Sequence, residues 1–418
     1  MKSSTETKPT NSPWRDHGVR PLLIARVLSC AGSFIQIVAA GWYVVDKTGS
    51  ATSVGILAAM AFGPAVIGSP IGGWLADKYS LVKLTTRLSV LEAIPPLLIG
   101  VLIWNDTLTM PLLYLLIFLG AIPGGLNRTP MSLLPVAAAS DDIRAAVVAD
   151  AAITYNIARL IGPIVGSALV ATVGPGATFA LNGLSFLYAA FVCARTKLVE
   201  KPHFEPRGSQ AKEGAKESYV GDIRRGMGFS VVRLALIGSL LFFGLVAPIQ
   251  QLMPAIARTQ GAHPLYLGIL LSAIAAGGIV ANPFVRRLMN RESTSAIVDI
   301  GLIIAGPSLL LLGLSQWLLV DLILLFILGM GWEGIWVASQ SALQLHLPPD
   351  IRGHMLGVFY ALVMLGTAAG AVLVGLLMDW IGTRNCLVAI GVLTCLYGIT
   401  SLHRLIRHGL NLADSSPS

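Results

Sequence analysis

Long apolar runs constrain this chain more than any other feature of its sequence. Each run holds about 20 residues or more, enough for a helix to cross the roughly 30 Å hydrocarbon core of a bilayer. Twelve runs meet this condition, at about 21–45, 52–76, 82–104, 110–138, 145–172, 177–195, 229–257, 265–288, 295–315, 318–346, 354–379 and 385–405. Only 12% of the residues are charged, about half the share found in soluble domains. The prediction is an all-α membrane protein with twelve transmembrane helices.

The chain also repeats itself at an offset of 208 positions, almost half of its 418 residues. The loop sequence Asp142-Ile143-Arg144 returns as Asp350-Ile351-Arg352. Three glycines coincide at the same offset, namely Gly162 with Gly370, Gly174 with Gly382, and Gly183 with Gly391. Many membrane transporters are built from two such halves with a path between them. We therefore expect two pseudo-symmetric six-helix halves at 21–195 and 229–405, a linker at 196–228, and tails at 1–20 and 406–418.

Lysine and arginine fall mainly on one side of the predicted membrane. Of the 29 basic residues, 23 lie in the two tails and the even-numbered loops, whereas the opposite loops carry three, Lys47, Arg258 and Arg384. Because basic loops stay in the cytoplasm, both termini and the linker are expected there. The same asymmetry accounts for the net charge of +8 without a nucleic-acid partner. The linker is rich in Lys, Glu, Gly and Pro, so we expect a flexible tether.

A short motif marks the end of the second predicted helix. It runs Gly73-Trp74-Leu75-Ala76-Asp77-Lys78, and two further basic residues, Lys83 and Arg87, follow it. This motif resembles the signature that the major facilitator superfamily carries between helices 2 and 3, except that Ser80 replaces its second glycine. The resemblance implies a twelve-helix transporter fold of two halves. It also implies a bacterial multi-pass protein of the cytoplasmic (inner) membrane.

The same resemblance implies a conformational latch at the cytoplasmic edge. Gly73 would allow close helix approach, and a charge cluster would hold one conformation and break in the other. The members of that cluster are Asp77, Lys78, Lys83 and Arg87. The second half carries a degenerate copy of this motif, in which Asn290 takes the place of the aspartate. The cluster in the first half is therefore expected to be the stronger latch.

The fifth predicted helix carries small residues at every fourth position, Ala158, Gly162 and Gly166, with Arg159 and Pro163 between them. Such spacing gives a flat packing face, and the proline adds a bend. The segment resembles the GxxxGPxxGG motif that is associated with exporters of the superfamily, with alanine in place of the first glycine. Arg159 is expected to have a structural role in it.

The resemblance narrows to one branch of the superfamily, which contains the enterobactin exporter and macrolide efflux proteins. It is carried by Ala25-Arg26-Val27-Leu28-Ser29, by Asn156-Ile157-Ala158-Arg159 and by Asn182-Gly183-Leu184-Ser185-Phe186. The known substrates of that branch are siderophores and drugs, so the branch alone does not name the substrate.

Polar and ionisable residues inside the predicted helices are the candidate site. A charged side chain in a bilayer costs about 3 kcal/mol on insertion scales and usually faces a cavity or a partner. In the superfamily, helices 1, 4, 7 and 10 line the central cavity. The resemblance therefore implies a substrate-binding set of Arg26, Gln36, Asn127, Arg128, Gln250, Gln251, Glu333 and Trp336. Asp150, Asp299 and Asp321 lie nearer to predicted helix ends, where we expect them at the membrane interface.

The two arginines on helices 1 and 4 would favour an anionic or polyhydroxylated substrate, and Glu92 or Glu333 would carry a coupling proton. Alternatively, Arg128 and Glu333 pair with each other and only hold the halves together. No cysteine or histidine spacing is typical of a metal site, and we expect no cofactor. No ATP-binding or hydrolase motif occurs in the sequence, so an ATP-driven pump and an enzyme are not expected.

The sequence thus predicts a secondary active exporter that works by alternating access, moves a siderophore or similar anionic metabolite, and is coupled to protons. Its partners would be the small-molecule substrate, protons and the lipid bilayer, and we expect a monomer. Two alternatives stay open, a multidrug or macrolide-type efflux pump of the same fold and an importer of organic anions.

Overall fold

The computed structural model describes residues 12–198, 219–259, 263–289 and 294–407, and these residues are almost entirely helical. Within them, 11 helical segments are long and apolar enough to cross a membrane. The longest, α5 (Arg144–Arg195), contains two spans because Gly174 has φ 82° and ψ 167°, outside the helical region. The predicted set of twelve transmembrane helices is therefore confirmed.

The N-terminal half comprises a short 3-10 turn and five labelled helices, η1 (Pro13–Arg15), α1 (Arg20–Thr48), α2 (Ala51–Lys78), α3 (Leu81–Trp104), α4 (Met110–Ala138) and α5. The C-terminal half contains α6 (Tyr219–Met227), α7 (Ser230–Leu241), η2 (Phe242–Val246), α8 (Pro248–Gln251), α9 (Met253–Thr259), α10 (Pro264–Met289), α11 (Thr294–Leu314), α12 (Leu318–His346), α13 (Pro349–Ile381) and α14 (Thr383–Arg407). Most ends agree with the apolar runs to within a few residues.

The seventh span is not the single helix predicted at 229–257. It consists of α7, the π-helical turn η2, α8 and α9. Pro248 cannot donate a backbone hydrogen bond, and its ring crowds the preceding turn. The chain widens before it, so that Ala247 N donates to Phe242 O at 2.8 Å, five residues back. Such π-turns inside helices often mark functional sites.

The last part of the linker predicted at 196–228 contains the short helix α6, which packs on α13. Asp222 accepts a 2.5 Å hydrogen bond from His354 Nδ1, and Arg225 Nη1 lies 2.8 Å from Asp350 Oδ2. The polar composition of the segment hid these partners, which are distant in sequence. Residues 199–218 of the predicted linker and the predicted tail beyond Arg407 lie outside the described residues.

The sequence repeat corresponds to repeated backbone geometry. Gly174 and Gly382 both have positive φ, 82° and 86°, and each ends a span before the next one begins. A residue with a side chain would be strained there, which explains why both halves carry glycine. Ile143 and Ile351 are both buried. The arginine that follows each of them donates to the carbonyl at the end of the preceding helix: Arg144 donates to Ala139 O at 3.3 Å, and Arg352 donates to Leu347 O at 2.9 Å.

The remaining glycine pairs are helix contacts that the two halves share. A Cβ at Gly162 would lie 2.7 Å from Phe34 Cβ on α1. Its counterpart Gly370 on α13 is pressed in the same way against Gly244 of η2. Each half therefore packs its fifth span against its first span at a glycine, because only glycine lets the backbones approach so closely.

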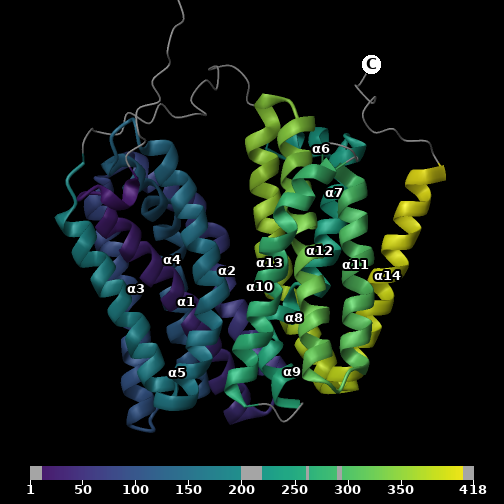
Figure 1. The fold of residues 1–418 in the computed structure, drawn as a ribbon, viewed down its shortest axis with the longest axis horizontal. Coiled ribbons are helices and arrows are strands. Elements are labelled where there is room, and N and C mark those ends of the chain that lie inside the picture. The colour runs from purple at the N-terminus through teal and green to yellow at the C-terminus, as the bar shows by residue number, and fades with distance from the viewer. Residues whose placement is uncertain (1–11, 199–218, 260–262, 290–293, 408–418) are drawn as a thin grey trace, which may run out of the picture.

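The two halves are joined along α2 with α13 and along α5 with α10, and Figure 1 shows them as two groups of helices that lie closest near the bottom of the view. We call this region the closed end; it includes the α1–α2 turn and Gly382. The opposite region, where α1 begins and α14 ends, is called the tail end.

Two polar contacts bridge the halves at the closed end. Asp379 of α13 sits at the N-terminus of α2, where it accepts hydrogen bonds from Ser50 Oγ (2.6 Å), Ala51 N (2.8 Å) and Thr52 N (2.9 Å). The carboxylate thus satisfies N–H groups that have no partner inside the helix. Arg258 Nη1 also lies 2.6 Å from Asp46 Oδ1, although both side chains are exposed.

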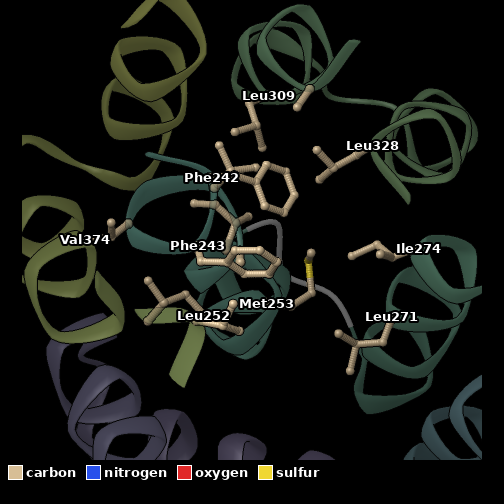
Figure 2. Close-up of a cluster of buried hydrophobic side chains, with 14 of the residues drawn as sticks. Phe242, Phe243, Leu252, Met253, Leu271, Ile274, Leu309, Leu328 and Val374 are labelled. Atoms are coloured by element: carbon tan, nitrogen blue, oxygen red, sulfur yellow. The ribbon is translucent and has the colours of Figure 1, made fainter. Parts of the chain in front are cut away.

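An aromatic core stiffens the C-terminal half around the broken seventh span. Figure 2 shows Phe242 and Phe243 in the middle of this cluster, surrounded by side chains such as Leu309 and Leu328. Both phenylalanines are buried and meet the Trp332 ring edge to face, with centroids 5.2 and 6.0 Å away. This packing fixes η2 and the helix α8 that follows it. It therefore also holds in place Gln250 and Gln251, the last two residues of α8.

Candidate central site

A narrow cavity lies between the two halves, next to the closed end. The N-terminal half lines it with Phe34 and Ile37 of α1 and with Arg159 and Pro163 of α5. The C-terminal half adds Gln250 and Gln251 of α8 and Leu271 of α10. Since side chains from both halves meet here, any rocking of one half against the other changes this site.

Arg159 and Gln250 supply the polar chemistry of this cavity. The Arg159 guanidinium lies over the Trp332 ring of the other half, 5.9 Å from its centroid, within range of a cation–π contact. Gln250 Oε1 is buried and accepts no hydrogen bond from the described residues. An unsatisfied buried acceptor costs about 1–3 kcal/mol, so a donor from a bound molecule would be stabilising here. The cavity has a volume of only about 20 Å³ in this conformation. Arg159 and Gln250 are therefore candidate contacts for a negative group and for a hydroxyl or N–H group, and the halves would have to separate to admit a whole substrate molecule.

The closed end seals this cavity by direct backbone contact. A Cβ on Gly41 of α1 would lie 2.6 Å from Pro254 Cγ of α9. Gly268 of α10 is pressed against the Pro163 carbonyl of α5. Ser272 Oγ nearby donates a 2.6 Å hydrogen bond to Leu160 O. These contacts hold the two halves together on the closed-end side of the cavity.

A second group of charges lies within the N-terminal half, nearer the tail end. Cys30 of α1 is within electrostatic range of Arg26, Arg128 and Glu92, so three of the predicted residues are gathered around one point. Arg26 Nη1 donates to Met131 O at 3.3 Å, whereas Arg128 is exposed. Among the described residues no ion pair joins Arg128 to Glu333, in contrast to the pairing that the sequence left open.

Two predicted substrate-binding residues instead bond within their own half. Asn127 is buried and donates through Nδ2 to Glu92 Oε2 at 2.6 Å and to Ser89 Oγ at 3.0 Å. Gln36 Oε1 accepts a 2.5 Å hydrogen bond from Asn182 Nδ2. These contacts tie α3 to α4 and α1 to α5. Their side chains are therefore positioned to hold helices together, and neither lines the central cavity.

In the C-terminal half, Glu333 of α12 is half-buried and accepts a 2.8 Å hydrogen bond from Asn282 of α10. Trp336, one turn further along α12, stacks in an aromatic cluster with Phe243 and Phe359, at centroid distances of 5.9 and 5.7 Å. Each half thus holds one glutamate that accepts a hydrogen bond from an asparagine, Glu92 in the first half and Glu333 in the second. The two glutamates lie on α3 and α12, which the internal repeat does not relate to each other.

The predicted latch lies at the tail end. Asp77, Lys83 and Arg87 are exposed there, and Lys78 Nζ lies over the Trp74 ring, 4.2 Å from its centroid. The glycine that α4 approaches most closely is Gly72, whereas a Cβ on Gly73 would meet only the Thr129 methyl group at 3.8 Å. The aligned Asn290 of the second half lies outside the described residues.

The small residues of α5 pack as the spacing predicts. Ala158 is buried, and Gly162 and Gly166 face α1, where a Cβ on Gly166 would lie 2.9 Å from Ile35 Cα. Arg159 and Pro163 line the central cavity. Arg159 therefore belongs to the candidate site, and the structural role expected for it stays a prediction.

Sequence reasoning missed the apolar part of the site and its arginine. Phe34, Ile37 and Leu271 look like any other lipid-facing or core residue, because their apolar character carries no information on which way the helix face points. Arg159 offered a usable signal, because it is a charged residue inside a predicted membrane helix, one turn before Pro163. Asp299 and Asp321, expected at the interface, are buried, and Asp299 accepts a 3.0 Å hydrogen bond from Ser401.

The described residues show no cluster of three or more His, Cys, Asp or Glu side chains that could hold a metal ion. The polar groups of the central cavity are amides and a guanidinium, which suit an organic ligand better than a metal.

Comparisons with known proteins agree with this architecture. The chain is 24% identical to the multidrug efflux pump Tap of Mycobacterium tuberculosis (strain H37Rv) over 94% of its own length and 95% of Tap. It is 25% identical to the enterobactin exporter EntS of Escherichia coli O1:K1, covering 85% of this chain and 84% of EntS. It is 18% identical to macrolide efflux protein A of Streptococcus pyogenes, over 88% and 91% of the two chains.

Solved structures share the fold at low sequence identity. A bacterial homologue of the human lysosomal transporter Spinster superposes with a TM-score of 0.75 at 15% identity, covering 98% of this chain and all of the other. The nucleoside transporter NupG gives a TM-score of 0.71 at 12% identity, over 93% and 99%. The sequence profile of the family described as transmembrane secretion effector matches residues 8–417, nearly the whole chain. This chain therefore belongs to the transmembrane secretion effector family of the major facilitator superfamily.

Proposed function

We propose that this protein is a secondary active exporter that binds a small organic molecule between its halves and releases it on the far side of the cytoplasmic membrane. The central cavity carries the proposal, because it draws Arg159 from one half and Gln250 and Gln251 from the other. The loop charges support a cytoplasmic location for both termini. On that orientation the closed end faces outward, and this conformation would receive substrate from the cytoplasm.

The substrate we favour is an anionic or polyhydroxylated metabolite of the siderophore type. Arg159 would pair with a negative group, the unsatisfied Gln250 Oε1 would accept from a hydroxyl, and Arg128 would attract the anion on its way in. The likeness to an enterobactin exporter supports the same class. The molecule would have to be organic and only partly ionic, since Phe34, Ile37 and Leu271 make up the rest of the lining.

A multidrug or macrolide-type efflux pump is the second candidate. Its support is the likeness to Tap and to macrolide efflux protein A, together with the aromatic wall around Trp332 and Trp336. Aromatic surfaces accept many shapes. A strain lacking this gene would separate the two candidates. Loss of siderophore secretion with unchanged drug susceptibility supports the first, and the reverse result supports the second. Uptake into oriented vesicles tests the importer alternative.

For coupling, we propose that Glu333 carries the proton. Replacing Glu333 with glutamine keeps the shape of the side chain and its bond with Asn282 but removes the ionisable group. In proteoliposomes, Glu333→Gln is expected to abolish accumulation driven by a proton gradient and to keep substrate exchange across the membrane. Glu92→Gln is the matched variant in the other half. Equal accumulation with and without a gradient in the unmodified protein would contradict proton coupling.

The latch proposal follows from the antiparallel packing of α2 and α13. Asp379 ends α13 and bonds the first residues of α2 at the closed end. By the same geometry, Asp77 ends α2 and would meet the first turn of α13 when the halves close at the tail end, with Lys78, Lys83 and Arg87 beside it. A carboxylate at a helix N-terminus contributes about 0.3–1 kcal/mol at an exposed site.

Asp77→Asn is therefore expected to lower transport about two- to fivefold, because loss of about 0.3–1 kcal/mol changes an equilibrium by about that factor. Folding and membrane insertion should stay intact. The measurement is initial export rate at equal abundance in the membrane. Asp141→Asn serves as control, because Asp141 is also exposed at the tail end but forms its ion pair, among the described residues, with Arg144 of its own half. Unchanged transport by the Asp77→Asn protein would refute the latch.

A further inference from the structure

A second and larger cavity lies on the C-terminal half, apart from the central one. Its volume is about 660 Å³, and α10, α11 and α12 form its walls. The lining is apolar, with Phe284, Ile300 and Met330 among its members, and Arg287 is the charged residue among the described residues that line it. The site described above uses none of these side chains.

The cavity is a groove on the outside of the bundle. Figure 1 shows α12 between α10 and α11, and these two helices each pack along α12 while scarcely contacting each other. Gly331 and Gly334 of α12 line the groove. A Cβ on Gly334 would lie 3.8 Å from Ile297, a residue of the groove wall, whereas Gly331 lets α11 approach, because a Cβ there would lie 2.8 Å from Gly301 O. Phe284 is 56% exposed at its edge. In a membrane, this outer face meets the hydrocarbon of the lipids.

Arg287 gives the groove a charged rim. It lies in the last turn of α10, at the tail end, and its side chain is exposed. Within the described part of the chain, its guanidinium has neither an ion pair nor a hydrogen bond. A long arginine stem can follow an apolar wall while the guanidinium stays at the membrane surface. There it can form paired hydrogen bonds with phosphate oxygens.

We propose that this groove binds one anionic phospholipid. An acyl chain would lie along Phe284, Ile300 and Met330, and the headgroup phosphate would meet Arg287. Basic pockets between transmembrane helices at the cytoplasmic side suit anionic headgroups. A neutral lipid would fill the apolar part of the groove but leave Arg287 without an anionic partner. Free phosphate would pair with Arg287 but leave the apolar part of the groove unfilled. The lipid would contact the back of α12, whose opposite face carries Trp332 of the central site.

The proposal is tested with the intact purified protein in detergent, titrated with phosphatidylglycerol or phosphatidylcholine and observed by native mass spectrometry. The unmodified protein is expected to retain one phosphatidylglycerol more tightly than any phosphatidylcholine. Arg287→Ala should weaken that binding about fivefold, the effect of one basic residue near a membrane surface. Arg286→Ala is the matched control, because Arg286 is an equally exposed neighbour that does not line the groove. Equal losses in the two variants, or equal retention of the two lipids, would overturn the proposal.

The acyl part of the site is tested by filling the groove. Ile300→Trp is expected to displace the retained phosphatidylglycerol, whereas Ile279→Trp, outside the groove on α10, should not. If Ile300→Trp does not fold, Gly334→Ala narrows the groove without a clash, because a Cβ there would lie 3.8 Å or more from its neighbours. Undiminished lipid retention in a folded groove-filling variant would show that the lipid binds elsewhere.

Discussion

Replacing Arg159 with alanine is expected to reduce export of an anionic substrate strongly. Among the described residues that line the central cavity, this guanidinium is the charged group. Hydrogen bonds to charged groups contribute about 1.5–3 kcal/mol, so transport at low substrate concentration should fall roughly 10- to 100-fold. Arg128→Ala should reduce export of the same anion by weakening its attraction from the tail end. Export from cells and substrate binding to purified protein are the two measurements.

The design includes two controls. Arg195→Ala removes an arginine of the same helix that also lies over an aromatic ring, Phe191, at 4.1 Å, but lines no part of the central cavity. Arg159→Lys keeps the charge and loses the planar guanidinium, so partial activity would indicate that charge dominates over geometry. If Arg159→Ala and Arg195→Ala export alike, Arg159 only supports packing, as the sequence motif first implied.

Asp379→Ala is expected to open the closed end. Its carboxylate accepts three hydrogen bonds from the first residues of α2, and it crosses from one half to the other. Because the side chain is exposed, solvent screening reduces the contribution to about 1–2 kcal/mol. The equilibrium between the two conformations should therefore shift about 5- to 30-fold away from the closed-end contact. Paired spin labels on α2 and α13 would report the change in separation.

Asp46→Ala is the comparison for this experiment. It removes a different contact between the halves at the closed end, the ion pair of Asp46 with Arg258, whose side chains are both exposed. Such pairs are worth about 0–1 kcal/mol, and no helix terminus is left unsatisfied. We expect a much smaller shift in the spin-label distances. Equal shifts for the two variants would show that general surface charge, rather than capping of α2, holds the closed end.

The membrane spans of this protein could be predicted from its sequence because the signals that define them are local. Apolar run length defined the spans, and the positive-φ glycines at 174 and 382 defined where two of them end. The break within the seventh span escaped prediction because apolar composition does not reveal a π-turn, although Pro248 was a visible cause. Helix α6 escaped because the partners that hold it, His354 and Asp350, lie more than a hundred residues away.

By itself, then, the sequence determined the class, the number and order of the spans, the two-fold repeat and the identity of the polar residues inside the membrane. Only the tertiary structure decided which of these residues share a site. Helix rotation is set by packing against neighbours, not by the hydropathy of the helix itself. Packing turned Gln36 and Asn127 toward partners in their own half. The same packing placed Arg159 opposite Gln250 and Gln251, where the halves meet.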